Sequence, residues 1–127
     1  MRSKDSVLRL QRFRYDEKQR QVAEIEMMIA EFQRKQEDLD QQVKVEEGRT
    51  GVSDPVHFNY SLTAKAIRTR RDNLVKSIND LRDQLADARA QLDAVAGELH
   101  KAELLLEKSV GPSLTMAAMS AAMPARS

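Results

Sequence analysis

The sequence predicts an all-α protein in which two long helices fold into an antiparallel coiled-coil hairpin. Three observations predict this fold. Residues 6–47 and 62–108 each carry apolar residues at alternating intervals of three and four positions. Between them, residues 48–61 gather two of the four glycines and one of the three prolines. Basic and acidic residues also follow one another in blocks along both stretches.

The first helix is expected over residues 6–47, with Ser6 as its N-terminal cap and Gly48 as its C-terminal stop. The apolar positions of its seam are Leu8, Tyr15, Val22, Ile25, Ile29, Phe32, Leu39 and Val43. Four further seam positions hold polar residues, namely Gln11, Lys18, Gln36 and Glu46. Because polar residues weaken a coiled-coil core, this seam is expected to be the weaker of the two.

The bend is expected over residues 48–61. Asp54 followed by Pro55 is a cap with proline at the first helical position, which predicts a short helical turn over residues 55–60. Ser61 is a second candidate cap, directly before the second helix.

The apolar residues of the bend allow two interpretations. Val56, Phe58 and Tyr60 either pack as a staple against Val43 and Ile67, or form an exposed tip that docks on a partner. The sequence favours the staple slightly and leaves both open.

The second helix is expected over residues 62–108. Its seam is broken only by Arg71 and otherwise comprises Ile67, Leu74, Ile78, Leu81, Leu85, Ala88, Leu92, Val95, Leu99, Ala102 and Leu106. Gly111 and Pro112 end the helix, so residues 1–110 form the hairpin domain. Residues 111–127 are rich in Ala, Met and Ser and are expected to be a flexible, disordered tail. The alternative is a short apolar helix on a partner.

Charge predicts the orientation of the two helices. Residues 2–20 hold seven basic and three acidic residues, whereas residues 21–47 hold three basic and eight acidic residues. The second helix has the same order, basic first and acidic later. Only an antiparallel pairing places each basic block beside an acidic block of the other helix.

The composition of the chain limits the classes of function that it can have. The chain has 127 residues, and its 21 basic and 20 acidic residues nearly cancel, which argues against a nucleic-acid partner. Cysteine is absent and no apolar run is long enough to span a membrane, so a soluble cytosolic protein is expected. His57 and His100 have no second ligand in register, so we expect no metal site. No catalytic or cofactor motif is evident, and a two-helix rod is expected to lack the concave pocket of an active site, so we expect no cofactor and no enzymatic activity.

Binding to other proteins is the class of function that these observations leave open. Six apolar residues fall outside the seams and either widen them or contact another protein: Leu10, Phe13, Met27, Met28, Leu104 and Leu105.

Two stretches carry a family likeness. The opening "LRLQRFRYDEKQRQVAEIEMMIAEFQ" and the bend with its following helix, "GVSDPVHFNYSLTAKAIRTRRDNL", resemble the FliJ family of bacterial flagellar type III export proteins, in its alphaproteobacterial form. The likeness covers roughly residues 1–107. It implies a non-enzymatic stalk or adaptor that binds the hexameric export ATPase ring and the membrane export gate and assists the recycling of export chaperones. It further implies a cytoplasmic protein, peripheral at the inner membrane through its partners only, that serves flagellum assembly and motility.

The resemblance also implies contact residues. Matched to the family's bend motif and the start of its second helix, the residues for the export gate are Asn59, Tyr60, Thr63, Ile67, Arg70 and Leu74. By analogy with the shafts of rotary ATPases, the residues for the ATPase ring are Arg9, Arg12, Phe13 and Arg14. Two other functions stay open, namely a prefoldin-like holdase chaperone and a generic coiled-coil scaffold without a dedicated partner.

Overall fold

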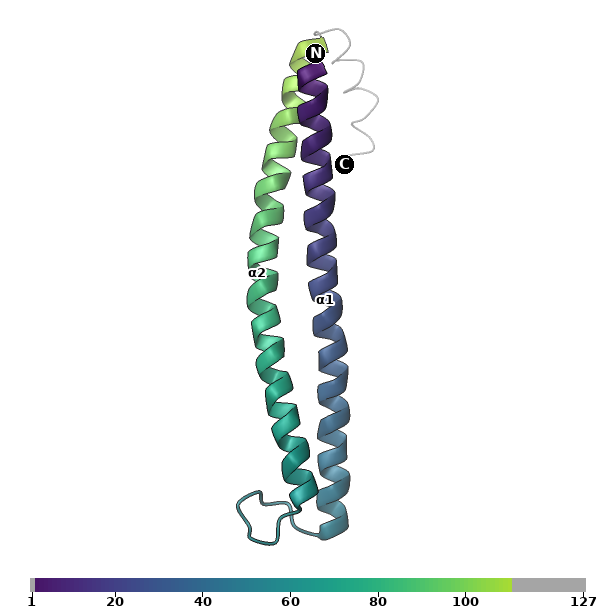
Figure 1. The fold of residues 1–127 in the computed structure, drawn as a ribbon, viewed down its shortest axis with the longest axis vertical. Coiled ribbons are helices and arrows are strands. Elements are labelled where there is room, and N and C mark those ends of the chain that lie inside the picture. The colour runs from purple at the N-terminus through teal and green to yellow at the C-terminus, as the bar shows by residue number, and fades with distance from the viewer. Residues whose placement is uncertain (1, 111–127) are drawn as a thin grey trace, which may run out of the picture. The chain divides into compact units, whose positions relative to one another are not determined.

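The computed structural model describes residues 2–110, which form two helices, α1 (Arg2–Thr50) and α2 (Leu62–Val110) (Figure 1). Each helix has 49 residues, and no strand occurs within the described range. The predicted all-α hairpin of two antiparallel helices is therefore confirmed. The tail predicted over residues 111–127 lies outside the described residues.

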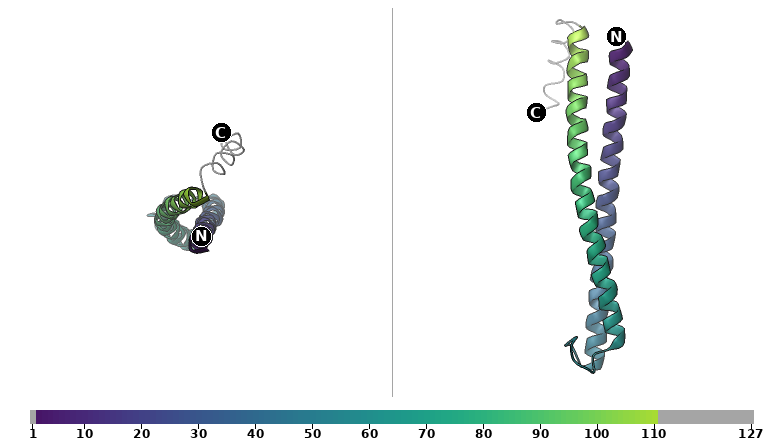
Figure 2. Two further views of the ribbon diagram at one scale, coloured as in Figure 1. Left: turned by 90° about the horizontal axis from the view of Figure 1, so that it is seen from above. Right: turned by 60° about the vertical axis from the view of Figure 1, so that its left-hand side comes forward.

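The hairpin divides into two units. The bend unit comprises residues 22–87, and the terminal unit combines the start of α1, up to residue 21, with α2 from residue 88 onward. Within each unit α1 and α2 lie side by side and run in opposite directions (Figure 2).

The bend unit contains a continuous apolar core. Its buried residues are Ile29, Ile78, Leu81 and Leu85, and Val22, Ile25, Phe32 and Leu74 pack against them. All eight belong to the predicted seams. Burial of one such side chain contributes about 1.5–3 kcal/mol relative to exposure, so this cluster supplies much of the stability of the unit.

The terminal unit has a smaller apolar core. The buried apolar residues in its described part are Leu8, Ala88 and Ala102. The polar seam residue Lys18 donates a hydrogen bond from Nζ to Gln91 Oε1, at 2.7 Å. Gln11 Oε1 is buried without a hydrogen-bond partner among the described residues. Since an unsatisfied buried acceptor is destabilising, the polar seam positions weaken this unit.

Arg71, the polar interruption of the second seam, joins the two helices of the bend unit. Its Nη1 lies 3.0 Å from Asp40 Oδ1 on α1, and its Nη2 lies 2.8 Å from Asp72 Oδ1. The pair places a residue of the acidic block of α1 beside a residue of the basic block of α2, as the charge pattern predicts.

Both predicted ends of the first helix were wrong. The helix begins at Arg2, so Ser6 lies inside it and caps nothing; Asp5 provides the favourable negative charge in the first turn. The helix also continues through Gly48 and stops at Gly51, whose φ is +76°. The Gly51 amide donates to the Glu47 carbonyl at 2.8 Å, the bond that closes a helix on a left-handed residue.

The helical turn predicted over residues 55–60 was also wrong. The segment forms two successive turns, in which the His57 amide donates to the Asp54 carbonyl and the Tyr60 amide to the His57 carbonyl, both at 3.0 Å. The side chains of Asp54 and His57 each accept a hydrogen bond from the amide two residues further on, at 3.1 and 3.0 Å. These local side-chain hydrogen bonds compete with the backbone hydrogen bonds of a helix, so the segment forms turns and not a helix.

The start of the second helix was predicted correctly. Ser61 Oγ accepts a hydrogen bond from the Ala64 amide at 3.1 Å, which is the bond of an N-terminal cap. The helix begins at Leu62 and extends to Val110, two residues beyond the predicted end. In the range that the structure describes, neither helix has a stretch long and apolar enough to cross a membrane.

The two glycines near the end of α1 should respond oppositely to alanine. At both positions an added Cβ would meet no atom within 4 Å, so only backbone conformation differs. Gly48→Ala should stabilise the protein by about 0.5–1 kcal/mol, because glycine is a poor helix former. Gly51→Ala should destabilise it by about 1–2 kcal/mol, because alanine disfavours positive φ. Denaturant unfolding followed by circular dichroism measures both, and a stabilising Gly51→Ala would contradict the assignment of the helix end.

Candidate functional site

The bend is tied to the last turn of α1 by two side-chain hydrogen bonds. Tyr60 Oη donates to Glu47 Oε2 at 2.6 Å, and Ser61 Oγ donates to Glu46 Oε1 at 3.1 Å. Burial, followed by the hydrogen bond to the Glu47 carboxylate, raises the pKa of Tyr60. The hydrogen bond from Arg49 lowers the pKa of Glu46, and the one from Ser61 adds to this effect against some desolvation.

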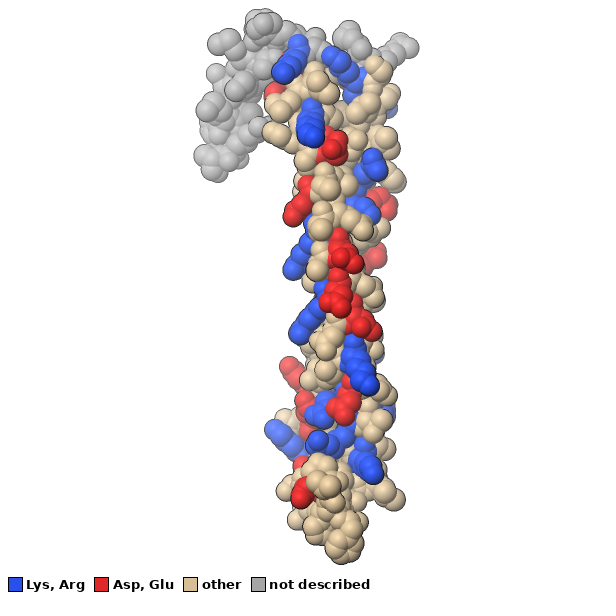
Figure 3. Space-filling model, turned by 90° about the vertical axis from the view of Figure 1, so that its left-hand side faces the viewer, with Lys and Arg blue, Asp and Glu red and all other residues tan. Residues whose placement is uncertain are grey.

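The bend was expected to be either a staple or an exposed tip, and each interpretation holds for part of it. Tyr60 is 8% exposed and staples the bend to α1. Val56 and Phe58 are 90% and 89% exposed, so the staple was wrong for them. The rings of His57 and Phe58 stack with centroids 4.9 Å apart. Val56, His57 and Phe58 thus form an exposed tip of the bend. On the face shown in Figure 3, the bend end of the bend unit carries few charged side chains.

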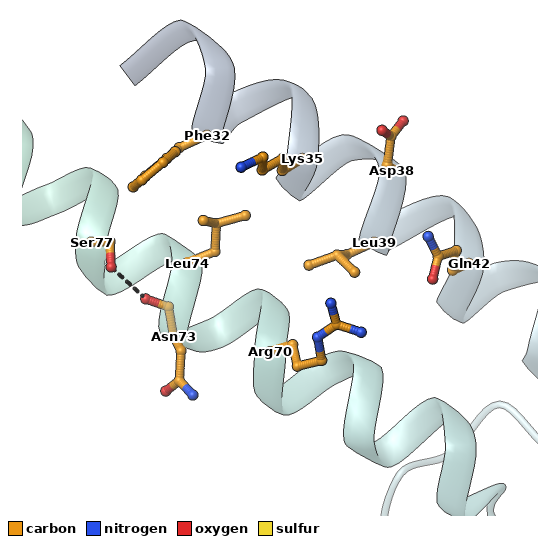
Figure 4. Close-up of a pocket in the computed structure, with 9 residues that line it drawn as sticks. All are labelled: Phe32, Lys35, Asp38, Leu39, Gln42, Arg70, Asn73, Leu74 and Ser77. Atoms are coloured by element: carbon orange, nitrogen blue, oxygen red, sulfur yellow. Dashed lines mark hydrogen bonds between the residues drawn. The ribbon is translucent and has the colours of Figure 1, made fainter. Parts of the chain in front are cut away.

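A groove opens along one flank of the bend unit, between α1 and α2 (Figure 4). This lateral groove has a volume of about 520 Å³. Phe32, Leu39 and Leu74 give it an apolar floor. Its remaining lining residues are Lys35, Asp38, Gln42, Arg70, Asn73 and Ser77.

Two cationic side chains flank the lateral groove. The Arg70 guanidinium extends from α2 toward α1, and the Lys35 ammonium lies 5.5 Å from the centroid of the Phe32 ring. The Asp38 carboxylate points away from α2 (Figure 4). An apolar floor with positive charge at its rim suits an amphipathic helix or extended segment that carries acidic side chains.

The six residues expected to contact the export gate do not form one surface. Arg70 and Leu74 line the lateral groove, while Asn59 and Thr63 are exposed. Ile67 is half-buried and lines a second, smaller groove with Val45. Tyr60 is buried against α1, where it holds the bend and is not free to reach a partner.

The four residues expected to contact the ATPase ring all lie on the exposed surface of α1 in the terminal unit. They are Arg9, Arg12, Phe13 and Arg14, and the Phe13 side chain is 60% exposed. The six apolar residues outside the seams are likewise exposed, so the interpretation that they widen the buried stripe was wrong. They remain available for contacts with other molecules.

Sequence reasoning missed the lateral groove as a site. Its floor residues Phe32 and Leu39 were recognised only as seam residues, and Leu74 and Arg70 were named only as expected gate contacts. Its rim residues Lys35 and Asn73 lie at flanking positions that no pattern singled out. The available signal is side-chain size: Asn73 and Ser77 are short, and they leave a hollow beside Phe32 and Leu74.

The chemistry that these surfaces support is binding. No group of three or more metal-ligating side chains occurs within residues 2–110. Comparison of the chain with protein-family models, with curated proteins and with solved structures finds no match.

The Tyr60–Glu47 hydrogen bond should make stability depend on alkaline pH. The pKa of Tyr60 is raised in the folded protein, so the protonated phenol contributes fully to the free energy of unfolding below the ordinary pKa of 10.0. This contribution is lost as the pH rises through the pKa of the folded protein. Tyr60→Phe should lower the free energy of unfolding by about 1–2 kcal/mol near neutral pH. The difference between the two proteins should shrink at about pH 11.

Unfolding in denaturant at both pH values tests this expectation, with Tyr15→Phe as the control. Tyr15 Oη only accepts a local bond from Gln19 Nε2 at 3.0 Å, so this variant should follow the parent protein. A Tyr60→Phe effect that is the same at both pH values would contradict the proposed role of the hydrogen bond.

Proposed function

We propose that this protein is a non-enzymatic stalk or adaptor of the bacterial flagellar type III export apparatus. The observation that carries the proposal is the antiparallel helical hairpin, which ends in a bend with the family-like residues "GVSDPVHFNY" and has an exposed contact surface in each unit. The proposed partners are the hexameric export ATPase, the membrane export gate and the export chaperones. The protein would act in the cytoplasm, at the inner membrane through these partners.

The terminal unit supplies the proposed contact with the ATPase ring. Arg9, Arg12 and Arg14 are exposed on the same stretch of α1 as Phe13, whose side chain is 60% exposed. Arginine and aromatic side chains contribute most strongly to protein interfaces, because they combine a large contact area with directed hydrogen bonds. An acidic, partly apolar face on the ATPase would complement this cluster.

The bend unit supplies the proposed contact with the export gate. The lateral groove presents Leu74 in its floor and Arg70 at its rim, and Asn59 and Thr63 add exposed polar groups near the bend. In this arrangement Tyr60 contributes indirectly, because it fixes the bend from which these groups project.

The ATPase contact can be tested with the export ATPase of the same organism. Adding this protein should stimulate ATP hydrolysis, and Arg12→Glu/Phe13→Ala should raise the concentration for half-maximal stimulation by about tenfold or more. The matched control is Arg34→Glu/Met27→Ala, which changes one exposed arginine and one exposed apolar residue elsewhere on α1. Absence of stimulation by the parent protein, with its helices verified by circular dichroism, would overturn the stalk proposal.

The gate contact can be tested by calorimetric titration of the cytoplasmic part of the gate protein. Lys35→Glu/Arg70→Glu reverses the charge at the rim of the lateral groove and should weaken binding by about tenfold or more. Lys44→Glu/Lys76→Glu makes the same charge change at exposed positions that do not line the groove, and should bind like the parent. Equal weakening by both variants would indicate a general charge effect and contradict the groove as the contact.

A further inference from the structure

Three large apolar side chains at the bend are the most exposed of their kind in the described part of the chain. Val56, Phe58 and Leu62 are 90%, 89% and 83% exposed, whereas Val45, which comes next, is 69% exposed. Val56 and Phe58 belong to the exposed tip of the bend, and Leu62 is the first residue of α2. Apolar surface concentrated in so short a stretch indicates a contact with another molecule.

The backbone of the exposed tip forms its hydrogen bonds within the bend. Pro55 has no amide hydrogen, and four of the next five amides, those of residues 56, 57, 59 and 60, donate to acceptors on Asp54 and His57. The acyl region of a bilayer offers no hydrogen-bonding groups, so a segment that enters its surface must satisfy its amides internally. A protein partner has polar groups of its own and does not impose this requirement.

A run of basic residues follows the exposed tip. Lys65 is exposed and lies three residues after Leu62, about 4.5 Å along the axis of α2. Figure 3 shows lysine and arginine side chains next to the bend end of the bend unit. Residues 55–71 contain no acidic residue, and their four basic residues form the basic stretch, namely Lys65, Arg68, Arg70 and Arg71.

The carboxylates at this end of the bend unit are engaged by neighbouring groups. Glu46 and Glu47 are half-buried, and each accepts a hydrogen bond from the bend. Asp54 is exposed, and its carboxylate accepts the amide of Val56. A surface that meets the exposed tip therefore also meets the basic stretch, and anionic lipid headgroups are attracted to basic side chains in such a position.

We propose that the exposed tip and Leu62 insert into the surface of a lipid bilayer that contains anionic lipids, with the basic stretch against the headgroups. Buried apolar area and attraction to anionic lipids together determine the strength of such a contact. The contact is direct and goes beyond the proposed function, in which partner proteins bring the chain to the membrane. It does not rest on that function. An apolar pocket on a protein and a second copy of the chain are outcomes that the experiment separates.

The chain contains no tryptophan, so one introduced tryptophan reports the surroundings of one position. Phe58→Trp places this reporter in the exposed tip. Phe13→Trp is the matched control, because Phe13 is an exposed phenylalanine of the terminal unit. Each full-length variant is titrated with vesicles of phosphatidylcholine and phosphatidylglycerol, with and without bromine on the acyl chains. Insertion predicts that the emission of the tryptophan at position 58 shifts to the blue and is quenched by bromine, and that the control shows neither effect.

Cosedimentation with the same vesicles measures the affinity. Val56→Ser/Phe58→Ser should raise the lipid concentration for half-maximal binding by about tenfold or more. Val7→Ser/Met27→Ser removes two exposed apolar side chains outside the bend and should bind like the parent protein. Vesicles of phosphatidylcholine alone should bind the parent at least about fivefold more weakly, because they lack the negative charge that attracts the basic stretch.

Four results would overturn the proposal. The first is an absent shift at position 58 in protein whose helices are verified by circular dichroism, or an equal shift at both reporters. The second is equal binding of the parent to both kinds of vesicle. A shift that grows with protein concentration without vesicles would assign the exposed tip to a second copy. A shift caused by the gate protein and not by vesicles would assign it to a protein pocket. The vesicle titrations contain neither ATPase nor gate protein, so their failure leaves the tests of the proposed function untouched.

Discussion

The constraint on which this structure depends is that two paired helices bury only one narrow stripe each. Apolar residues at intervals of three and four fill that stripe, and no large side chain among the described residues is completely shielded from solvent. The six apolar residues outside the seams of the two helices are therefore exposed despite being apolar. For the same reason the hollows of this protein are open grooves at the flanks of the seam, which suit elongated partners better than small molecules.

Polar residues within the seam help to fix the register of α1 against α2. Apolar residues alone would let one helix shift along the other at little cost. Arg71 reaches Asp40 in the bend unit, and Lys18 reaches Gln91 in the terminal unit. A shift of one helix by a turn would separate both pairs, and it would leave the part-buried Arg71 and Asp40 without each other as partners. The seam thus gains a defined register at some cost in stability, as is common for polar core positions of coiled coils.

Features that depend on periodicity or on one residue's local bonding were predictable, and features that depend on distant neighbours were not. The seams, the antiparallel orientation and the Ser61 cap follow from patterns along the chain. The choice of Gly51 over Gly48 as the helix end depends on where the chain must turn toward α2. The Tyr60–Glu47 hydrogen bond joins residues thirteen positions apart, and the lateral groove is lined by residues of both helices. No one-dimensional pattern encodes these distances.

The Tyr60–Glu47 hydrogen bond also has a consequence for the order in which the chain folds. It links residues separated by 13 positions, whereas the Lys18–Gln91 bond links residues separated by 73. Loop-closure entropy makes the longer connection about 1.5 kcal/mol less favourable when it forms first. Once the bend is closed, each further seam contact adds only a short loop. The hairpin should therefore zip from the bend toward the chain ends, and it should fray in the reverse order.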